Sequence, residues 1–544
     1  MNFFLSEVIG TPALILSALV LFFSCDANKL ELTNPNQLSP DTYFTTPSQV
    51  QSAVNAVYGS LQTTGMYNRG MWYSSENMAH ENTCNSQQEA DKREWLNFSF
   101  GPNHGLMEAY WSSCYRGINK ANFVINNEQA MTDNIPTSIL PAATRDKYIG
   151  EAKFLRALYY FNLVTRYGDI PLYLGTDPAE KDGLAKSPKE AVWAQIEADC
   201  ADAAAKCLSK AAEEPGRVTS GAAWALLGKA RLYQENYSGA LEAFNNITGY
   251  SLEPEYFRNF MEETENGPES LFEVQFNIEA GYSQQWNSDR TDEGKNESTF
   301  RAQEYGCLNW FNVFVSEDLW NEFETAADNG SKIDPRRGYC AYQTGDLYNN
   351  NTMTITVDPV TVLDKDGNQI DFYQRRGWRK YQNYYKAATE GAVAGNQSGI
   401  NMKVIRYADV LLMKAEAEAN RPGGSLTAAV ALMNQVRARA DVNLPLYGTA
   451  AMNTSYPVSN LAQFMVALEH ERKVELCGEQ VRYGDLVRWG RLADFIQNEC
   501  KPTTPKADQA ALVFNPAKHY LWPIPQKEID VNPNIEQTDQ NPGW

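Results

Sequence analysis

The sequence predicts a protein dominated by α-helices that pack in pairs, with long loops between the helical segments. Two segments, AAWALLGKARLYQENYSGALEAFNNI (222–247) and RYADVLLMKAEAEAN with SLTAAVALMNQVRARA (406–440), each read as two helices joined by a short turn. The first keeps the spacing of a tetratricopeptide repeat at six positions: Trp224, Leu227, Gly228, Tyr237, Ala240 and Phe244. Residues 62–110 and 251–400 are instead polar and contain stretches rich in Asn and Gly, as loops do.

The first 24 residues have the character of a signal peptide. Residues 14–23, LILSALVLFF, form an apolar run that is too short to cross a bilayer. Ser24 and Cys25 follow directly, and the chain then turns polar. This order resembles a bacterial lipoprotein signal, in which Cys25 becomes the lipidated first residue and residues 25–45 form an extended tether. A buried N-terminal helix is the alternative.

From residue 46 to residue 544 we expect a single domain. Its first helix is signalled by Thr46, Pro47 and Gln49, which read as N-cap, N1 proline and capping-box glutamine. A second helix, beginning at YIGEAKFLRALYY, ends at Gly168 because the following Asp-Ile-Pro forbids continuation. The helical scaffold is expected mainly at 46–61, 111–250 and 401–500, and an irregular C-terminal strap at 501–544.

The two loop-rich ranges are expected to carry the function, because long ordered loops on a rigid scaffold usually do. A small β-hairpin is predicted where TMTITV (352–357) and QIDFY (369–373) flank Asp366-Gly367. Asp364, Asp366 and Asn368 offer oxygen ligands for Ca²⁺, but the spacing of an EF-hand loop is missing. We interpret the segment as a solvated turn and expect no cofactor.

Composition excludes several classes of function. The formal net charge is −20, and nucleic acid is a poor partner for such a surface. The cysteines after Cys25 are scattered without a CxxC pair, and the four histidines form no HExxH motif. Nucleotide loops and serine nucleophile motifs are also missing. The sequence therefore predicts no catalytic residue and no metal site.

The densest charged segment is EHERKVELCGEQVRYGDLVRWG (469–490). On a helix, Glu471 and Glu475 share one face, and Arg472 and Lys473 alternate with them. Arg482 continues the pattern. Catalysis is conceivable for such a cluster, but we interpret it as an ion-pair network that joins helices.

Five segments together resemble the SusD-like (RagB/SusD) family. They are NPNQLSPDTYFTTPSQVQSAVNAVYGSLQ, YIGEAKFLRALYYFNLVTRYGDIPL, RYADVLLMKAEAEA, ERKVELCGEQVRYGDLVRW and the terminal LWPIPQKEIDVNPNIEQTDQNPGW, in family order. The resemblance implies an α/α superhelical scaffold of four tetratricopeptide-like helix pairs under a variable loop-rich half. It also implies a non-enzymatic lipoprotein that binds oligosaccharide at the cell outer membrane and partners a SusC-like TonB-dependent transporter. The tail would then be fixed by burial of Trp522, Ile524 and Trp544.

The residues that bind sugar differ between members of this family, so we choose candidates from loop context. A sugar site needs exposed aromatic rings beside planar polar groups. The candidate rings are Trp72, Tyr73, Trp95, Trp286, Tyr305 and Trp310, and the polar partners are Asn77, Gln284 and Arg290. Trp111 and Tyr115 lie at helical spacing and are expected in the core. A surface glycoside hydrolase and a helical-repeat adaptor for proteins are the alternative functions.

Overall fold

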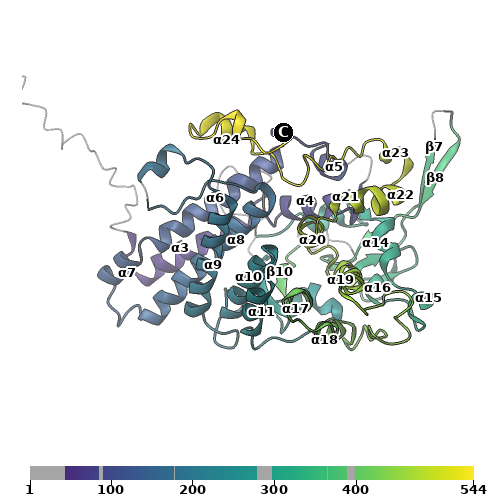
Figure 1. The fold of residues 1–544 in the computed structure, drawn as a ribbon, viewed down its shortest axis with the longest axis horizontal. Helices are drawn as coiled ribbons and strands as arrows, with labels where there is room; N and C mark the ends of the chain where they lie inside the picture. The colour runs from purple at the N-terminus through teal and green to yellow at the C-terminus, as the bar shows by residue number, and fades with distance from the viewer. Residues whose placement is uncertain (1–42, 85–89, 177, 279–296, 364–365, 389–397) are drawn as a thin grey trace, which may run out of the picture.

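The computed structural model describes residues 43–84, 90–176, 178–278, 297–363, 366–388 and 398–544, which form a helical scaffold beside a half made of short elements (Figure 1). The longer helices are α3 (Pro47–Gly59), α6 (Gly105–Ile125), α8 (Ala142–Tyr167), α9 (Lys189–Lys206), α10 (Ser220–Tyr233), α11 (Tyr237–Asn245), α17 (Tyr407–Asn420), α18 (Leu426–Arg437) and α19 (Leu461–Leu476). The shorter helices are α4 (Gly70–Met78), α5 (Ala90–Asn97), α7 (Glu128–Asn134), α13 (Arg301–Tyr305), α14 (Glu317–Glu322), α15 (Ala326–Asn329), α16 (Arg336–Cys340), α20 (Arg482–Arg488), α21 (Leu492–Asp494), α22 (Lys501–Thr503), α23 (Lys506–Gln509) and α24 (Gln526–Val531).

The described strands form small antiparallel pairs rather than one sheet. The pairs are β1 (Asn82–Cys84) with β3 (Val313–Val315), β2 (Ser270–Val274) with β10 (Met402–Arg406), β4 (Ala341–Tyr342) with β9 (Gly377–Trp378), β5 (Leu347–Tyr348) with β6 (Met353–Thr354), and β7 (Val360–Leu363) with β8 (Gln369–Tyr373). Strands this short contribute little independent stability, so the loop-rich half depends on packing against helices.

The scaffold helices stack in chain order. Helix α8 packs against α6 and α9, α9 packs against α10, and α10 packs against α11, which meets α17. Figure 1 shows α3, α6, α8, α9, α10 and α11 together on the left of the molecule. A Cβ atom on Gly228 would overlap the Phe244 ring, so this glycine lets α10 and α11 approach closely. The predicted fold class, tetratricopeptide-like helix pairs with a loop-rich half, is confirmed.

Local signals set the helix ends that the sequence predicted. Thr46 accepts a hydrogen bond from the Gln49 backbone, and the Gln49 side chain accepts one from the Thr46 backbone, which completes the capping box of α3. Helix α8 ends at Gly168, whose φ of +71° suits a residue without a side chain. Helix α8 begins at Ala142, a little before the predicted segment.

Two predictions about the loop-rich ranges are wrong. Residues 62–110 are not a loop, because they contain α4, α5 and the start of α6. The partner of β8 is β7 rather than residues 352–357, and β6 pairs with β5 instead. Pairing with β7 closes a shorter loop, which costs less conformational entropy. Asp364 lies outside the described residues, so the turn beside it stays a prediction.

The C-terminal tail runs across the top of the molecule in Figure 1 and is held by its aromatic side chains. Trp522 is fully buried against Tyr110 and Tyr167, and its backbone N–H donates to the carbonyl of Arg166 at 2.7 Å. Trp544 stacks on Phe100 with ring centroids 5.2 Å apart. Trp522 and Ile524 are buried as expected, and residues 501–544 also contain the short helices α22, α23 and α24.

The first 42 residues, which include the predicted signal peptide and Cys25, lie outside the described part of the chain. Within the ranges that are described, no helix has both the length and the apolar character needed to cross a lipid bilayer.

Candidate functional site

Most of the aromatic residues chosen as exposed rings are buried. Trp72, Tyr73 and Tyr305 are all fully buried and form one cluster, in which the Trp72 centroid lies 4.5 Å from Tyr73 and 4.8 Å from Tyr305. The Trp72 indole donates to the carbonyl of Tyr67, and the Tyr73 hydroxyl donates to Glu304. The expectation that these rings are exposed is wrong, because α13 brings distant residues against α4 and covers them.

Trp95 and Asn77 also belong to the interior. The Trp95 ring is fully buried and lies 4.6 Å from His104 and 6.2 Å from Trp522, centroid to centroid. The Asn77 amide donates to the carbonyl of Lys92 at 2.9 Å, and its oxygen accepts from the Asn82 amide. Their prediction as ligand contacts is therefore wrong. Asn77 satisfies neighbouring polar groups, and Trp95 supports the tail.

Gln284, Trp286 and Arg290 lie outside the described residues and stay predictions.

Trp310 is the exposed aromatic residue that sequence reasoning placed correctly. Its side chain belongs to the loop between α13 and β3, and 47% of the residue surface is exposed. Asn309 and Asn312 flank it, so planar amides accompany the ring along the chain. An indole offers a flat apolar face that stacks well on the CH face of a sugar ring.

The loop that carries Trp310 is fixed by backbone hydrogen bonds. The N–H of Trp310 donates to the carbonyl of Gln303 at 3.1 Å, and the N–H of Asn312 donates to the carbonyl of Glu304 at 2.8 Å. Phe311 has a φ of +51° and turns its ring inward, where it packs against Phe314. Phe311 is thus buried while the neighbouring Trp310 stays exposed.

Trp320 on α14 was not predicted as a site residue and is not an open platform. The Arg337 and Arg376 guanidinium groups lie over its ring at 4.6 Å and 4.3 Å from the centroid. Cation–π contacts of this kind occupy the face that a sugar would need.

Among the cavities in the described residues, one of about 660 Å³ is lined by residues of α8, α10, β10, α20 and the tail. Several charged groups on its wall belong to the fold, since Lys229 pairs with Asp409 at 3.3 Å and Lys403 pairs with Glu273. Lys229 and Lys403 are therefore held in ion pairs within the fold.

A second cavity, about 530 Å³, was not found by sequence reasoning. Its wall includes the rings of Trp111, Tyr115 and Tyr173 and the amide of Asn119. Trp111 is buried, as predicted, and its indole donates to Glu528 at 3.1 Å, whereas Tyr115 is only half-buried. Helical spacing identified these rings as core residues but could not show that they also border a hollow.

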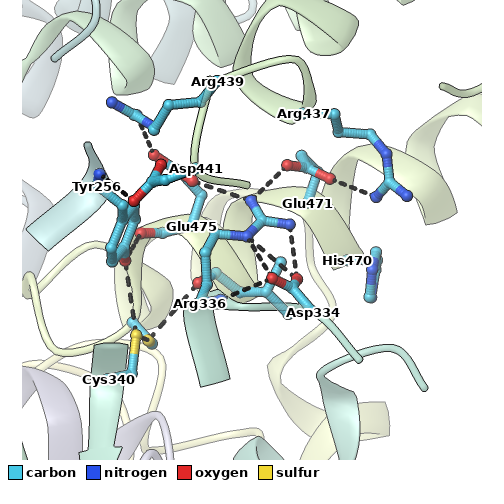
Figure 2. Close-up of polar contacts among 12 residues, drawn as sticks. Tyr256, Asp334, Arg336, Cys340, Arg437, Arg439, Asp441, His470, Glu471 and Glu475 are labelled. Carbon is cyan, nitrogen blue, oxygen red and sulfur yellow. Dashed lines mark hydrogen bonds and ion pairs between the residues drawn. The ribbon is translucent and has the colours of Figure 1, made fainter. Parts of the chain in front are cut away.

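The predicted ion-pair network of residues 469–490 is confirmed and is buried (Figure 2). Arg336 donates to Glu471 at 2.6 Å and to Glu475 at 2.9 Å. Arg437 and Arg439 approach the same two carboxylates from the other side. Figure 2 shows how Arg336 lies between Asp334 and Glu471.

The charge state of the network fits a structural role. Burial alone would raise the pKa of Glu475, but the guanidinium groups of Arg439 and Arg406 hold it well below its usual range. Glu471 behaves in the same way beside Arg336. Both carboxylates stay ionised and fully engaged, so neither is available as a general acid. In the part of the chain that the structure describes, no three His, Cys, Asp or Glu side chains gather as a metal site.

Comparisons with known proteins agree over nearly the whole chain. Residues 268–544 match the SusD family, and residues 30–233 match a family described as starch-binding and associating with the outer membrane. The chain is 25% identical over 533 residues to SusD-like protein P2 of Formosa agariphila, which covers 93% of this chain and 94% of that protein.

Solved structures share the fold. A SusD superfamily protein from Bacteroides vulgatus superposes with a TM-score of 0.73 at 25% identity, over 92% of this chain and 100% of that one. Surface glycan-binding protein A from Bacteroides thetaiotaomicron, solved in complex with laminarihexaose, has a TM-score of 0.67 at 20% identity, over 91% and 100% of the two chains. At that identity the second likeness shows the fold alone.

Proposed function

Because this chain belongs to the SusD family, we propose that it is a non-enzymatic glycan-binding lipoprotein of the outer membrane. It holds oligosaccharide at the cell surface and delivers it to a SusC-like TonB-dependent transporter for nutrient uptake. Cys25 carries the lipid, and residues 25–45 form the tether. The description of the matched N-terminal family, starch-binding and associating with the outer membrane, supports both the ligand class and the location.

The exposed indole of Trp310 is the observation that carries the ligand-binding part of the proposal. Apolar side chains exposed on a soluble surface are common, but a large ring whose loop is anchored at two backbone positions is already organised for contact. Little side-chain freedom is then lost when a flat ligand stacks on it. The complex of a fold relative with laminarihexaose supports a carbohydrate as that ligand.

The state of the carboxylates supports a binding rather than a hydrolytic role. Glycoside hydrolysis uses two acidic groups that flank the scissile bond across a cleft. The acidic residues Glu471 and Glu475 are fully buried, and each is paired with arginine. A substrate could reach neither of them without breaking the core.

Titration calorimetry on the purified protein tests the proposal, after a glycan array has identified a soluble oligosaccharide that binds. We expect Trp310→Ala to weaken affinity about tenfold, because it removes one stacking face. The melting temperature should change little, since nearly half of this residue is in solvent. Trp224→Ala, which removes a half-buried indole from α10, is the matched control and should keep wild-type affinity.

Several results would count against the proposal. If Tyr173→Ala weakens binding and Trp310→Ala does not, the ligand lies in the second cavity. If no glycan binds the wild-type protein, the carbohydrate function is wrong, and the helical-repeat adaptor becomes the better interpretation. Release of shorter sugars during the titration would identify a glycoside hydrolase.

A further inference from the structure

The sulfur atoms of Cys340 and Cys477 are in contact inside the protein. They lie 3.3 Å apart, although the two residues are 137 positions apart in the sequence. Cys340 is the last residue of α16, and Cys477 is the C-cap of α19. Both residues are fully buried. The fold thus brings the sulfur atoms of two thiols from different parts of the chain into direct contact.

Two other contacts of these sulfur atoms are longer than the contact between them. The Tyr256 hydroxyl lies 3.6 Å from the Cys340 sulfur, as Figure 2 shows, and the Cys477 sulfur lies 3.7 Å from the carbonyl of Val474. By contrast, Cys114 has the thioether of Met66 as its neighbour, at 3.5 Å. Contact with a second thiol therefore distinguishes Cys340 and Cys477 from Cys114.

A buried ammonium group lies beside this pair. Lys380 donates to the carbonyl of Cys477 at 2.7 Å and is itself fully buried. Burial raises the pKa of the Cys477 thiol well above its ordinary value. Burial acts on Cys340 in the same direction, but the hydrogen bond from Cys477 and the Lys380 charge outweigh it and lower the Cys340 pKa. In the closed fold the pKa values of the two thiols are therefore shifted in opposite directions.

We propose that Cys340 and Cys477 form a disulfide bond by exchange with an external disulfide. The thiolate of one cysteine attacks one sulfur of the oxidant, a low-molecular-weight or protein disulfide, and expels a thiolate. The thiolate of the other cysteine then attacks the protein sulfur of this mixed disulfide and expels the second thiolate. Two protein thiols are oxidised to one disulfide, and the oxidant is reduced to two thiols. Because both sulfurs are enclosed in the finished fold, the exchange takes place while the chain is still closing.

The bond would join the loop-rich half to the scaffold. Residues between the two cysteines include β7 and β8 as well as α17 and α18, so the bond closes a long loop of the unfolded chain. A cross-link of this kind lowers the conformational entropy of the unfolded chain and so favours the folded state. The inference does not depend on the proposed glycan function.

Refolding followed by mass spectrometry tests the inference. The full chain is unfolded in urea with reductant, refolded with oxidised glutathione, denatured again and alkylated. We expect the alkylated protein to carry two alkyl groups fewer than the fully reduced and alkylated form, and to yield a proteolytic fragment that links the peptides of Cys340 and Cys477. The oxidised protein should also melt at a higher temperature than the reduced protein.

Matched variants complete the test. Cys477→Ser should leave Cys340 free for alkylation, and Cys114→Ser, which removes a buried cysteine whose neighbour is a thioether, should keep the linked peptide. The wild-type protein alone is decisive if a variant fails to fold. Full alkylation of both Cys340 and Cys477 after oxidative refolding, or linkage of either one to a different cysteine, would overturn the inference.

Discussion

At the scale of single residues, burial and neighbouring carboxylates have opposite effects on the pKa of His470. Its Nδ1 lies 2.6 Å from Glu322 and its Nε2 lies 3.1 Å from Glu324, while its ring stacks on Tyr456 at 4.0 Å. Burial by itself would lower the pKa of His470, but the two carboxylates prevail and raise it to about 9. The imidazolium is therefore the form that the fold holds at neutral pH.

This arrangement predicts a loss of stability at alkaline pH. The His470 pKa is raised from 6.5 to about 9, so its contribution is complete below pH 6.5 and is lost as pH rises through 9. We expect the free energy of unfolding to fall by about 2–3 kcal/mol more in the wild type than in His470→Gln over that range. Urea unfolding at pH 6.5 and 9.5 gives the free energy of unfolding of both proteins.

The comparison with His470→Gln is needed because other groups titrate in the same range. Burial, together with the neighbouring Glu76, raises the pKa of Glu81 to about 8, and burial raises the pKa of Glu265 to about 8. Those groups are present in both proteins, so their effect cancels in the difference. Equal pH dependence in the two proteins would show that His470 is not held as imidazolium.

At the scale of secondary-structure elements, α19 is a helix that buries charged side chains as well as apolar ones. Glu471, Arg472, Lys473 and Glu475 are each at most 3% exposed, and each has an ion-pair partner. A helix usually buries an apolar stripe, and this one also joins its neighbours through buried salt bridges. Removing a single partner leaves an opposite charge uncompensated in the interior, which is costly.

The number of carboxylates on each arginine predicts the size of that cost. Arg336 contacts Asp334, Glu471 and Glu475, whereas Arg482 contacts Glu469. We expect Arg336→Ala to lower the free energy of unfolding by about 3–5 kcal/mol and Arg482→Ala by about 1–3 kcal/mol. Denaturant unfolding of the two variants tests this order. Equal losses, or a larger loss for Arg482→Ala, would contradict it.

At the scale of the whole molecule, the acidic fold and the N-terminal segment have separate roles. The chain carries a net charge of −20, so electrostatic attraction does not hold it on an anionic lipid surface. We propose that residues 14–23 and the Ser24-Cys25 junction direct the alternative, which is a covalent lipid. The described fold begins only at Tyr43, beyond the proposed anchor.

Replacing the proposed anchor should therefore change location without changing the fold. We expect Cys25→Ala to move most of the protein from the membrane fraction to the soluble fraction, with an unchanged melting temperature. Cell fractionation, metabolic labelling with a radioactive fatty acid and a thermal melt together provide the measurement. Cys114→Ala is the control for loss of a cysteine. A Cys25→Ala protein that is still labelled and still sediments with membranes would rule out lipidation at this position.

Sequence reasoning was reliable where the physical cause is local. The capping box at Thr46 and the helix end at Gly168 depend on neighbours within a few residues, and both were predicted correctly. The buried state of Trp72 was not, since its ring is covered by Tyr305 and its neighbour Tyr73 bonds Glu304, 231 residues away. Polar residues beside a tryptophan in the sequence describe only its chain neighbours. In this fold, apolar residues that are distant in the sequence pack against the ring.

In the hairpin and in the candidate site, too, local features were predicted and features that depend on tertiary packing were not. The strand β8 was predicted correctly, but the local sequence did not show that residues 360–363 rather than 352–357 would pair with it. Trp310 is exposed, as expected from its polar loop, whereas the same reasoning failed for Trp72 and Trp95. Contact between Cys340 and Cys477 depends on tertiary packing alone.

The position of Trp522 in the chain has a consequence for the order in which the protein is made. The tail packs against α6, and Trp111 on that helix donates to Glu528, 417 residues later. The chain emerges from the ribosome with its N-terminus first, so α6 appears long before the tail that covers it. Until then an apolar surface around Tyr110 and Tyr167 has no permanent cover. The packing around Tyr110 and Tyr167 is therefore completed only after nearly the whole chain has been made.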